Sequence, residues 1–305
     1  MIDRRQFLIG GVALPLIGLG LGAYAVVVEP NFILNITRYR LTPKDWPPGL
    51  RLRFAAISDI HAGEPFMSAA RIGRIAQAVN ALAPDAILLL GDYNAGHRFI
   101  RRAVTSQQIG EALSALRAPL GVFAVLGNHD WWHGDLLGRP NDGTTGIRRA
   151  LTQAGIRVLE NDAVPLSKDG EKFWLLGLGD QLVRFWGHAG DEDKIGVDDL
   201  EGTLNKVTDS APIVMMAHEP MIFRDVPNRI ALTLSGHTHG GQINLPLLGP
   251  VVGQLRFGRS LVYGHSQVED RHIIVSGGLG ESVAPVRFLR PPEILEITLG
   301  GGEES

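Results

Sequence analysis

The sequence predicts an α/β fold in which most strands are buried on both faces. Short apolar runs have the length and composition of buried strands, and segments with helical spacing separate several of them. Asp, His or Asn follows closely on each run. In open α/β sheets ligands bind beyond the carboxyl ends of the strands, so these strand ends predict one shared site. The runs are Leu52 to Ile57, Ala86 to Leu90, Gly121 to Leu126, Pro212 to Ala217 and Ile230 to Leu234.

The amino terminus carries the pattern of an export signal or of a membrane anchor. Arg4 and Arg5, followed by x-Phe-Leu and an uncharged apolar stretch from Ile9 to Val28, resemble a twin-arginine signal, although Asp3 replaces the usual Ser or Thr. Ala23-Tyr24-Ala25 has the small residues of a peptidase site. Without cleavage, about 20 apolar residues are just long enough to span a bilayer, with the arginines on the cytoplasmic side. Residues 1–30 are therefore predicted as a signal or anchor.

Capping and spacing signals predict the remaining elements. Residues 31–48 combine a linker with a first strand. From Ser68 to Leu82 apolar residues recur at helical spacing behind Ser68 as N-cap, and Pro84 closes this helix. Further helices are predicted from Ser106 to Leu116, Thr145 to Ala154 and Asp198 to Val207. Further strands are predicted from Arg157 to Leu159, Ala163 to Leu166, Phe173 to Leu178, His272 to Ser276 and Ile294 to Leu299.

Composition limits the chemistry of the site. The 305 residues suffice for a large core, and 29 basic against 32 acidic residues leave a net charge of −3. No basic patch or aromatic-interleaved stripe suggests nucleic acid as a partner. The chain has no cysteine, which excludes disulfides and thiolate ligands. Any metal must therefore be bound by oxygen and imidazole, a donor set that favours Mn, Fe or Zn.

The segment Gly236-His237-Thr238-His239-Gly240-Gly241-Gln242 is the most informative motif. In an extended strand end the side-chain period is two, so His237 and His239 are expected to point the same way, as half of a metal site. Taken alone, the motif equally fits a glycine-rich turn with two solvated histidines. The other strand ends supply matching ligands: Asp59-x-His61, Gly91-Asp92, Gly127-Asn128-His129-Asp130 and His218.

In this order and spacing the five motifs resemble those of the calcineurin-like metallophosphoesterase family, from about Arg51 to Gln242. Together with the arginine pair they resemble its exported bacterial YkuE/YaeI-like branch. The resemblance implies a four-layer α-β-β-α sandwich, in which helices flank two facing mixed β-sheets and the site lies at one edge. It makes residues 31–305 a metallophosphoesterase catalytic domain.

The resemblance also implies a centre of two divalent metal ions. Such a pair, about 3.5–4 Å apart, binds phosphoryl oxygens and supplies a hydroxide for in-line attack on phosphorus. The implied ligands are Asp59, His61 and His239 for the first metal, Asn128, His218 and His237 for the second, and Asp92 as the bridge. His129 is placed beside the leaving-group oxygen as a general acid or charged donor. Taken singly, Asp92 also fits a turn residue, Asn128 a helix N-cap and His129 a structural histidine.

The loop after Asp92 departs from the protein-phosphatase branch. That branch carries a second Asp and then an Arg, where this sequence has Ala95 and Gly96. The departure argues against phosphoproteins and leaves smaller or exposed phosphodiesters and phosphomonoesters as substrates. Asp130, which follows His129 in the Gly127-Asn128-His129-Asp130 motif, is predicted to orient the loop of that motif. Arg287, in a late loop, is predicted to meet substrate phosphate.

The predicted function is therefore hydrolysis of phosphoesters by an exported enzyme with two metal ions. The expected location is the periplasm or cell envelope, or the membrane itself if residues 9–28 remain as an anchor. The expected partners are the export machinery and a small-molecule or lipid-linked phosphoester. One alternative is a pyrophosphohydrolase acting on a nucleotide-linked envelope lipid. The other is a non-catalytic metal-binding envelope protein, which would have no need of a general acid such as His129.

Overall fold

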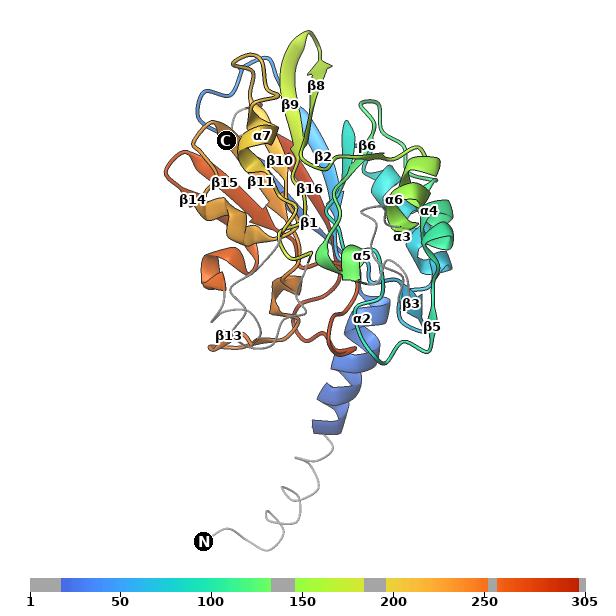
Figure 1. Cartoon of the computed structure of the whole chain (residues 1–305). Helices are drawn as coiled ribbons and strands as arrows, with labels where there is room; N and C mark the ends of the chain where they lie inside the picture. The colour runs from blue at the N-terminus through green and yellow to red at the C-terminus, as the bar shows by residue number, and fades with distance from the viewer. Residues whose placement is uncertain (1–17, 133–145, 184–195, 252–256, 302–305) are drawn as a thin grey trace, which may run out of the picture.

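Two large mixed β-sheets form the centre of the molecule and confirm the predicted fold class (Figure 1). The computed structural model describes residues 18–132, 146–183, 196–251 and 257–301. The first sheet has the strand order β1-β16-β2-β4-β6-β7, in which β2, β4, β6 and β7 run parallel and β16 runs antiparallel to β2. Its strands are β1 (Asn35–Leu41), β2 (Leu52–Ile57), β4 (Ala86–Leu89), β6 (Val122–Ala124), β7 (Arg157–Val158) and β16 (Glu293–Leu299).

The second sheet has the order β14-β15-β11-β10-β9-β8, with four parallel central strands and antiparallel strands at both edges. Its strands are β8 (Asp162–Lys168), β9 (Glu171–Gly177), β10 (Ile213–Met216), β11 (Ile230–Ser235), β14 (Gly264–Val268) and β15 (Arg271–Val275). Two small antiparallel pairs complete the strands. They are β3 (Gly63–Glu64) with β5 (Arg102–Ala103), and β12 (Asn244–Leu245) with β13 (Gly249–Pro250).

The helices lie mainly on the outer faces of the sheets (Figure 1). The α-helices are α2 (Glu29–Phe32), α3 (Ala69–Ala81), α4 (Ser106–Leu113), α5 (Asn128–Trp132), α6 (Gly146–Gln153) and α7 (Leu200–Leu204). The shorter helical segments are η1 (Tyr24–Val28), η2 (Pro220–Arg224), η3 (His239–Gly241) and η4 (Arg259–Leu261). The predicted helices all form near their expected bounds. In α3 the Ser68 hydroxyl accepts the backbone N–H of Arg71, as its N-cap assignment requires.

Three apolar clusters separate four layers. One joins α3, α4 and α6 to the outer face of the first sheet, through residues such as Ile72 and Ile87. A second fills the space between the sheets, where Phe54 faces Phe173. The third lies under η2 and α7 on the outer face of the second sheet. Burial of each such side chain contributes about 1.5–3 kcal/mol, so these clusters fix the strands whose ends form the site.

The N-terminal helical segment projects from the body of the molecule (Figure 1). It begins within the described residues at position 18 and ends with α2. Among the described residues, no helix combines the length and the apolar character needed to cross a membrane. The base of the segment is fixed to the domain, because the buried Glu29 carboxylate accepts the backbone N–H groups of Leu289 (2.8 Å) and Arg290. The carbonyl of Ala25 accepts the N–H of Arg287 at 2.9 Å.

Candidate metal centre

The predicted site residues meet at the edge of the two sheets where the parallel strands end. Three overlapping groups of His and Asp side chains each bring their ligand atoms within 4.8 Å of one another. Asp59 and His61 follow β2, Asp92 follows β4, and α5 begins at Asn128 directly after β6. His218 follows β10, and His237 and His239 follow β11. The groups are Asp59, His61 and His239; His61, Asp92 and His129; and Asp92, His218 and His237.

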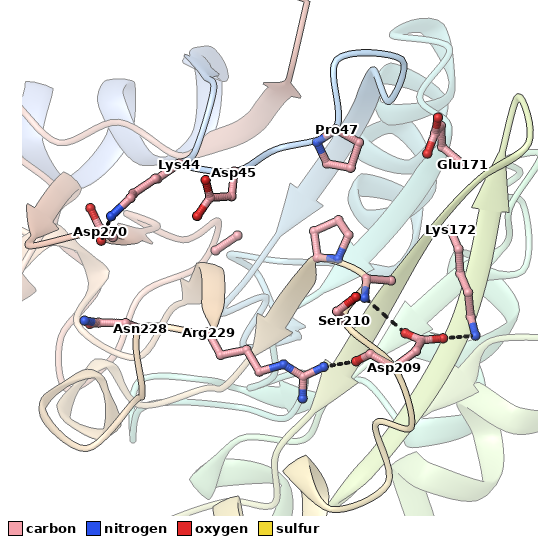
Figure 2. Close-up of a pocket in the computed structure, with 13 residues that line it drawn as sticks. Lys44, Asp45, Pro47, Glu171, Lys172, Asp209, Ser210, Asn228, Arg229 and Asp270 are labelled. Carbon is pink, nitrogen blue, oxygen red and sulfur yellow. Dashed lines mark hydrogen bonds and ion pairs between the residues drawn. The ribbon is translucent and has the colours of Figure 1, made fainter.

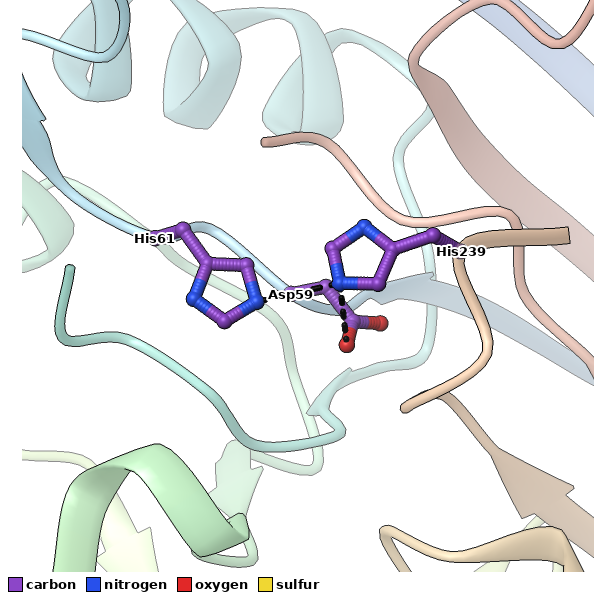
Figure 3. A group of neighbouring side chains, drawn as sticks. All are labelled: Asp59, His61 and His239. Carbon is purple, nitrogen blue, oxygen red and sulfur yellow. Dashed lines mark hydrogen bonds and ion pairs between the residues drawn. The ribbon is translucent and has the colours of Figure 1, made fainter. Parts of the chain in front are cut away.

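In the first group, two imidazoles and one carboxylate converge (Figure 3). The Nε2 atoms of His61 and His239 lie 3.0 Å apart, and His239 Nε2 lies 3.5 Å from Asp59 Oδ1. The opposite ring nitrogens are held by backbone carbonyls: His61 Nδ1 donates to Asn94 O at 2.9 Å, and His239 Nδ1 to Gly280 O at 3.2 Å. These bonds select the tautomer in which each Nε2 lone pair faces the centre of the group.

The group of Asp92, His218 and His237, called the second group below, has the same construction. His218 Nδ1 donates to Leu90 O at 2.7 Å, which directs Nε2 toward Asp92. His237 Nδ1 lies 2.9 Å from Asn128 Oδ1, and the His218 and His237 rings meet edge to face. Within the described chain, the buried His218 Nε2 makes no hydrogen bond of good geometry. A cation would satisfy this nitrogen, and carboxylate, amide and neutral imidazole donors suit Mn, Fe or Zn.

Asp92 joins the two groups. Its Oδ2 atom lies 3.6 Å from His61 Nε2 and 3.1 Å from His218 Nε2, so one carboxylate oxygen lies between imidazoles of both groups. Its Oδ1 atom accepts the backbone N–H of His129 at 2.9 Å. The His129 ring meets the His61 ring edge to face, with 4.8 Å between centroids. The residue predicted as the general acid therefore lies beside the predicted bridge.

Burial keeps the first group of imidazoles neutral. Burial lowers the pKa of His61 to about 3 and lowers the pKa of His239 well below its ordinary range. Burial also raises the pKa of Asp59 to about 6. Burial opposes the charged form of His218 too, but the adjacent Asp92 carboxylate outweighs it and raises the pKa of His218. A cation beside His218 Nε2 and Asp92 Oδ2, which lie 3.1 Å apart, would likewise place positive charge between these two ligand atoms.

The backbone of the ligand residues differs from the sequence-based expectation. Asp59, His61, Asp92, His237 and His239 all have φ between 46° and 68°, the left-handed region that non-glycine residues rarely enter. β11 ends at Ser235, so the extended geometry assumed for the two histidines after it does not apply. The expectation from spacing that they point to one position is wrong. The structure groups them as the resemblance implied, with His239 beside Asp59 and His61, and His237 beside Asp92 and His218.

Two further predictions concern the loops around the centre. The buried Asp130 carboxylate accepts backbone N–H groups from Asp92 (2.9 Å), Tyr93 (2.9 Å), Asn94 (3.2 Å) and Gly127 (2.9 Å), which confirms that it orients the loop. The prediction for Arg287 is wrong. Its guanidinium is fully buried and donates to the carbonyls of Gly277, Gly280 and Arg290, so it supports the loop and does not face a substrate.

Sequence reasoning missed the groups that orient the imidazoles. The acceptors are backbone carbonyls of Leu90, Asn94 and Gly280, and a carbonyl leaves no signature in residue type. Ser58 was also missed. Its hydroxyl donates to Asp59 Oδ2, and its position directly before the first ligand was the available signal.

A hollow of about 740 Å³ lies away from the metal centre, at the opposite ends of the strands (Figure 2). Both lysines that line it already pair with carboxylates of the lining: Lys172 with Asp209, and Lys44 with Asp270 at 2.8 Å. The Arg229 guanidinium donates to the Asp209 carbonyl. The hollow contains none of the predicted ligands. Among the described residues, the groups of side chains that could hold a metal ion lie at the carboxyl-end edge of the sheets.

Comparison with known proteins agrees with this geometry. Residues 52–241 match the model of the calcineurin-like phosphoesterase family, a range that includes all seven predicted ligands and His129. The chain belongs to the calcineurin-like phosphoesterase family. It is 31% identical to the uncharacterized metallophosphoesterase YkuE of Bacillus subtilis, over 98% of both chains. It is 30% identical to the phosphodiesterase YaeI of Escherichia coli, over 98% of this chain and all of that one.

A third relative carries a more specific name. The chain is 29% identical to the UDP-2,3-diacylglucosamine pyrophosphatase LpxG of Chlamydia muridarum, over 88% of this chain and 89% of that one. Family membership makes this calcineurin-like phosphoesterase a metal-dependent hydrolase of phosphoester bonds.

Proposed function

We propose that the protein hydrolyses phosphoesters with two divalent metal ions held at the strand-end edge. The position of Asp92 Oδ2 between His61 and His218 carries the proposal, because a carboxylate shared by two ligand groups is what a two-metal site requires. Two bound cations would supply Lewis acidity and an activated water for attack on phosphorus. The proposed ligands are Asp59, His61 and His239 on one side, Asn128, His218 and His237 on the other, and Asp92 between them.

The remaining residues of the centre bind, orient and move protons. His129 is proposed to protonate the leaving-group oxygen, since its backbone N–H is fixed to Asp92 and its ring adjoins His61. Asp130 holds the loop of Asp92 in position through its backbone hydrogen bonds. Gly96, in place of the arginine of the protein-phosphatase branch, leaves no guanidinium at that position, which favours small or lipid-linked phosphoesters as substrates.

The test is hydrolysis of bis(p-nitrophenyl) phosphate and of p-nitrophenyl phosphate by the full chain loaded with Mn²⁺. We expect turnover of at least one, abolished in Asp92→Asn and reduced about 10²-fold or more in His129→Ala. The matched control is Asp270→Asn, which removes an exposed carboxylate paired with Lys44 far from the centre. Two equivalents of bound metal with no hydrolysis of any phosphoester would instead favour a metal-binding protein without catalytic activity.

We further propose that the enzyme works outside the cytoplasm with its N-terminal segment retained as an anchor. The arginine pair lies outside the described residues, and the proposal for it depends on the sequence alone. Retention is supported by the contacts of Tyr24, whose ring packs edge to face on Phe288, and by those of Ala25 and Glu29. Cleavage after Ala25 would cut a helix that is part of the fold.

Cell fractionation with mass spectrometry of the intact chain tests both points. We expect the enzyme in the membrane fraction with residues 1–30 present. A mature chain that begins after Ala25 would contradict retention. Export that persists after Arg4→Lys and Arg5→Lys together would contradict the twin-arginine route.

A further inference from the structure

Exposed apolar side chains gather around the N-terminal segment, on the side of the molecule that carries the metal centre. The loop between β12 and β13 exposes Leu247 (104%) and Leu248 (67%), and Val283 is 79% exposed. Phe32, at the end of α2, is 77% exposed. Single exposed apolar residues are ordinary on protein surfaces, but a group of them marks an interaction surface.

Backbone hydrogen bonds join the segments that carry these residues. The N–H of Asn244, in β12, donates to the Phe288 carbonyl at 2.8 Å, and Glu29 accepts from Leu289 in the same loop. The N–H of Val283 donates to the carbonyl of Gly96 at 3.2 Å, which ties this loop to the one after Asp92. In Figure 1, β13, α2 and the β3–β5 pair all lie on the side from which the N-terminal segment projects.

The loop after Asp92 adds positive charge and a further aromatic ring to this surface. Arg98 and Arg101 are exposed, and the Arg98 guanidinium lies 5.3 Å from the ring centre of Phe99, which is 47% exposed. Exposed apolar groups interleaved with arginines match an anionic lipid surface, where the apolar groups enter the interface and the guanidinium groups meet head-group phosphates.

The same loop connects this surface to the metal centre. Its residues line a hollow of about 540 Å³ that includes Ile100 and Val104 beside the two arginines. Gly96, which lines the hollow, is so close to His61 that a Cβ atom would lie 2.6 Å from the Nδ1 atom. The loop that lines the hollow therefore packs directly behind the His61 ring, whose Nδ1 donates to the Asn94 carbonyl of the same loop.

We propose that this surface docks on an anionic lipid bilayer, with the metal centre facing the membrane. We define the docking surface as Phe32, Phe99, Leu247, Leu248, Val251, Val283 and Leu289 together with Arg98 and Arg101. The bilayer is its occupant because the apolar run from Ile9 to Val28 leads directly into it, so an anchored chain brings this surface to the membrane. The inference builds on the proposed function and narrows the substrate class to phosphoesters held at a bilayer surface.

The absence of cysteine from the chain allows a direct test. Leu248→Cys and Val283→Cys, each labelled with an environment-sensitive fluorophore, are compared with Val268→Cys in the full chain. Val268 is the matched control, since it is 46% exposed but is the last residue of β14, next to the β14–β15 turn at the far end of the strands. With vesicles of phosphatidylethanolamine and anionic phosphatidylglycerol, we expect a blue shift and quenching by doxyl lipid at positions 248 and 283 but not at 268.

A label at 248 and 283 that stays in water would overturn the proposal. So would a shift that appears without vesicles and grows with protein concentration, because a second copy of the chain would then cover the surface. A kinetic measurement adds a second readout. We expect Leu247→Ser with Leu248→Ser to lower turnover of hexadecyl p-nitrophenyl phosphate in vesicles by about tenfold, from lost apolar burial. Turnover of water-soluble bis(p-nitrophenyl) phosphate should not change, and Val268→Ser should affect neither.

These measurements separate the docking proposal from the proposed function. If the Leu247 and Leu248 double variant loses turnover of both substrates equally, or loses turnover of neither, docking is contradicted. Hydrolysis by the parent chain would still support the proposed function. Immersed labels on a chain that hydrolyses neither substrate would contradict the function and support docking.

Discussion

Gly127→Ala is expected to disable the metal centre by adding a single methyl group. Gly127 lies between β6 and α5, at the point where both ligand groups approach the backbone. A Cβ atom built on it would lie 2.3 Å from Asp92 Oδ1, 2.7 Å from Asp92 N and 2.7 Å from His218 Nε2. None of these atoms is the free end of a flexible side chain, so the structure has no simple way to make room.

The size of the effect follows from these distances. Ordinary van der Waals contact begins at 3.4 Å, so the Asp92 carboxylate would have to move by about 1 Å. His218 cannot withdraw without breaking its hydrogen bond to the Leu90 carbonyl. A displacement of about 1 Å in a catalytic group costs about 10²-fold in rate, and overpacking costs about 1–3 kcal/mol of stability.

Three measurements on the purified variant test this reasoning: bound metal by mass spectrometry, turnover of bis(p-nitrophenyl) phosphate, and thermal unfolding. The control is Gly73→Ala in α3, where a Cβ atom meets nothing within 4 Å. We expect this control to keep its metal and activity and to gain about 0.5–1 kcal/mol from helix propensity. A Gly127→Ala protein with the parent metal content and turnover would refute the placement of Asp92 and His218.

Three further predictions concern residues outside the ligand set. Asp130→Asn should weaken metal binding about 10–100-fold, measured by competition with a chelator, because an amide nitrogen would face backbone N–H donors. Arg287→Met should lower the free energy of unfolding by about 3 kcal/mol in urea titration, since it leaves buried carbonyls unpaired. Hydrogen bonds from Lys172 and Trp174 hold the pKa of Asp209 at about 2, so its contribution to stability is present above about pH 4 and is lost as the pH falls through about 2. Asp209→Asn should remove this part of the acid dependence, and an unchanged acid denaturation curve would contradict the assignment.

The sequence predicted the residues of the site better than their directions. Apolar runs ending in Asp, His or Asn located every strand end that carries a predicted ligand, because buried parallel strands have a recognisable composition. It also predicted α3 with its N-cap. It did not predict β14, whose mixed pattern of buried and exposed residues lacks strict alternation. Edge strands are held by their neighbours more than by their own residues, so such strands escape detection by pattern.

The spacing argument failed for the directions of His237 and His239, although the family resemblance had assigned each of them to the group that it joins. Left-handed backbone at a histidine or aspartate costs of order 1–3 kcal/mol at each position, and local sequence gives no sign that the fold supplies this energy. Tertiary contacts supply it. The Asp92 loop, for example, is held by the Asp130 carboxylate from the next strand connection. Residue types therefore identify the ligands, whereas their spacing along the chain does not show which of the two groups each one joins.

Burial of Arg287 and Glu29 connects the N-terminal segment to the metal centre. Glu29 fixes Leu289 and Arg290, and the Arg287 guanidinium holds the carbonyl of Gly280, which in turn orients His239. One loop thus bears the base of the N-terminal helix on one side and a proposed metal ligand on the other. Because the buried Arg287 guanidinium donates to three backbone carbonyls of this loop, a displacement of the helix would be transmitted to the imidazole. Glu29→Ala should therefore lower metal affinity as well as stability, although Glu29 contacts no ligand residue, and loss of stability with unchanged metal affinity would show that the loop does not couple the two.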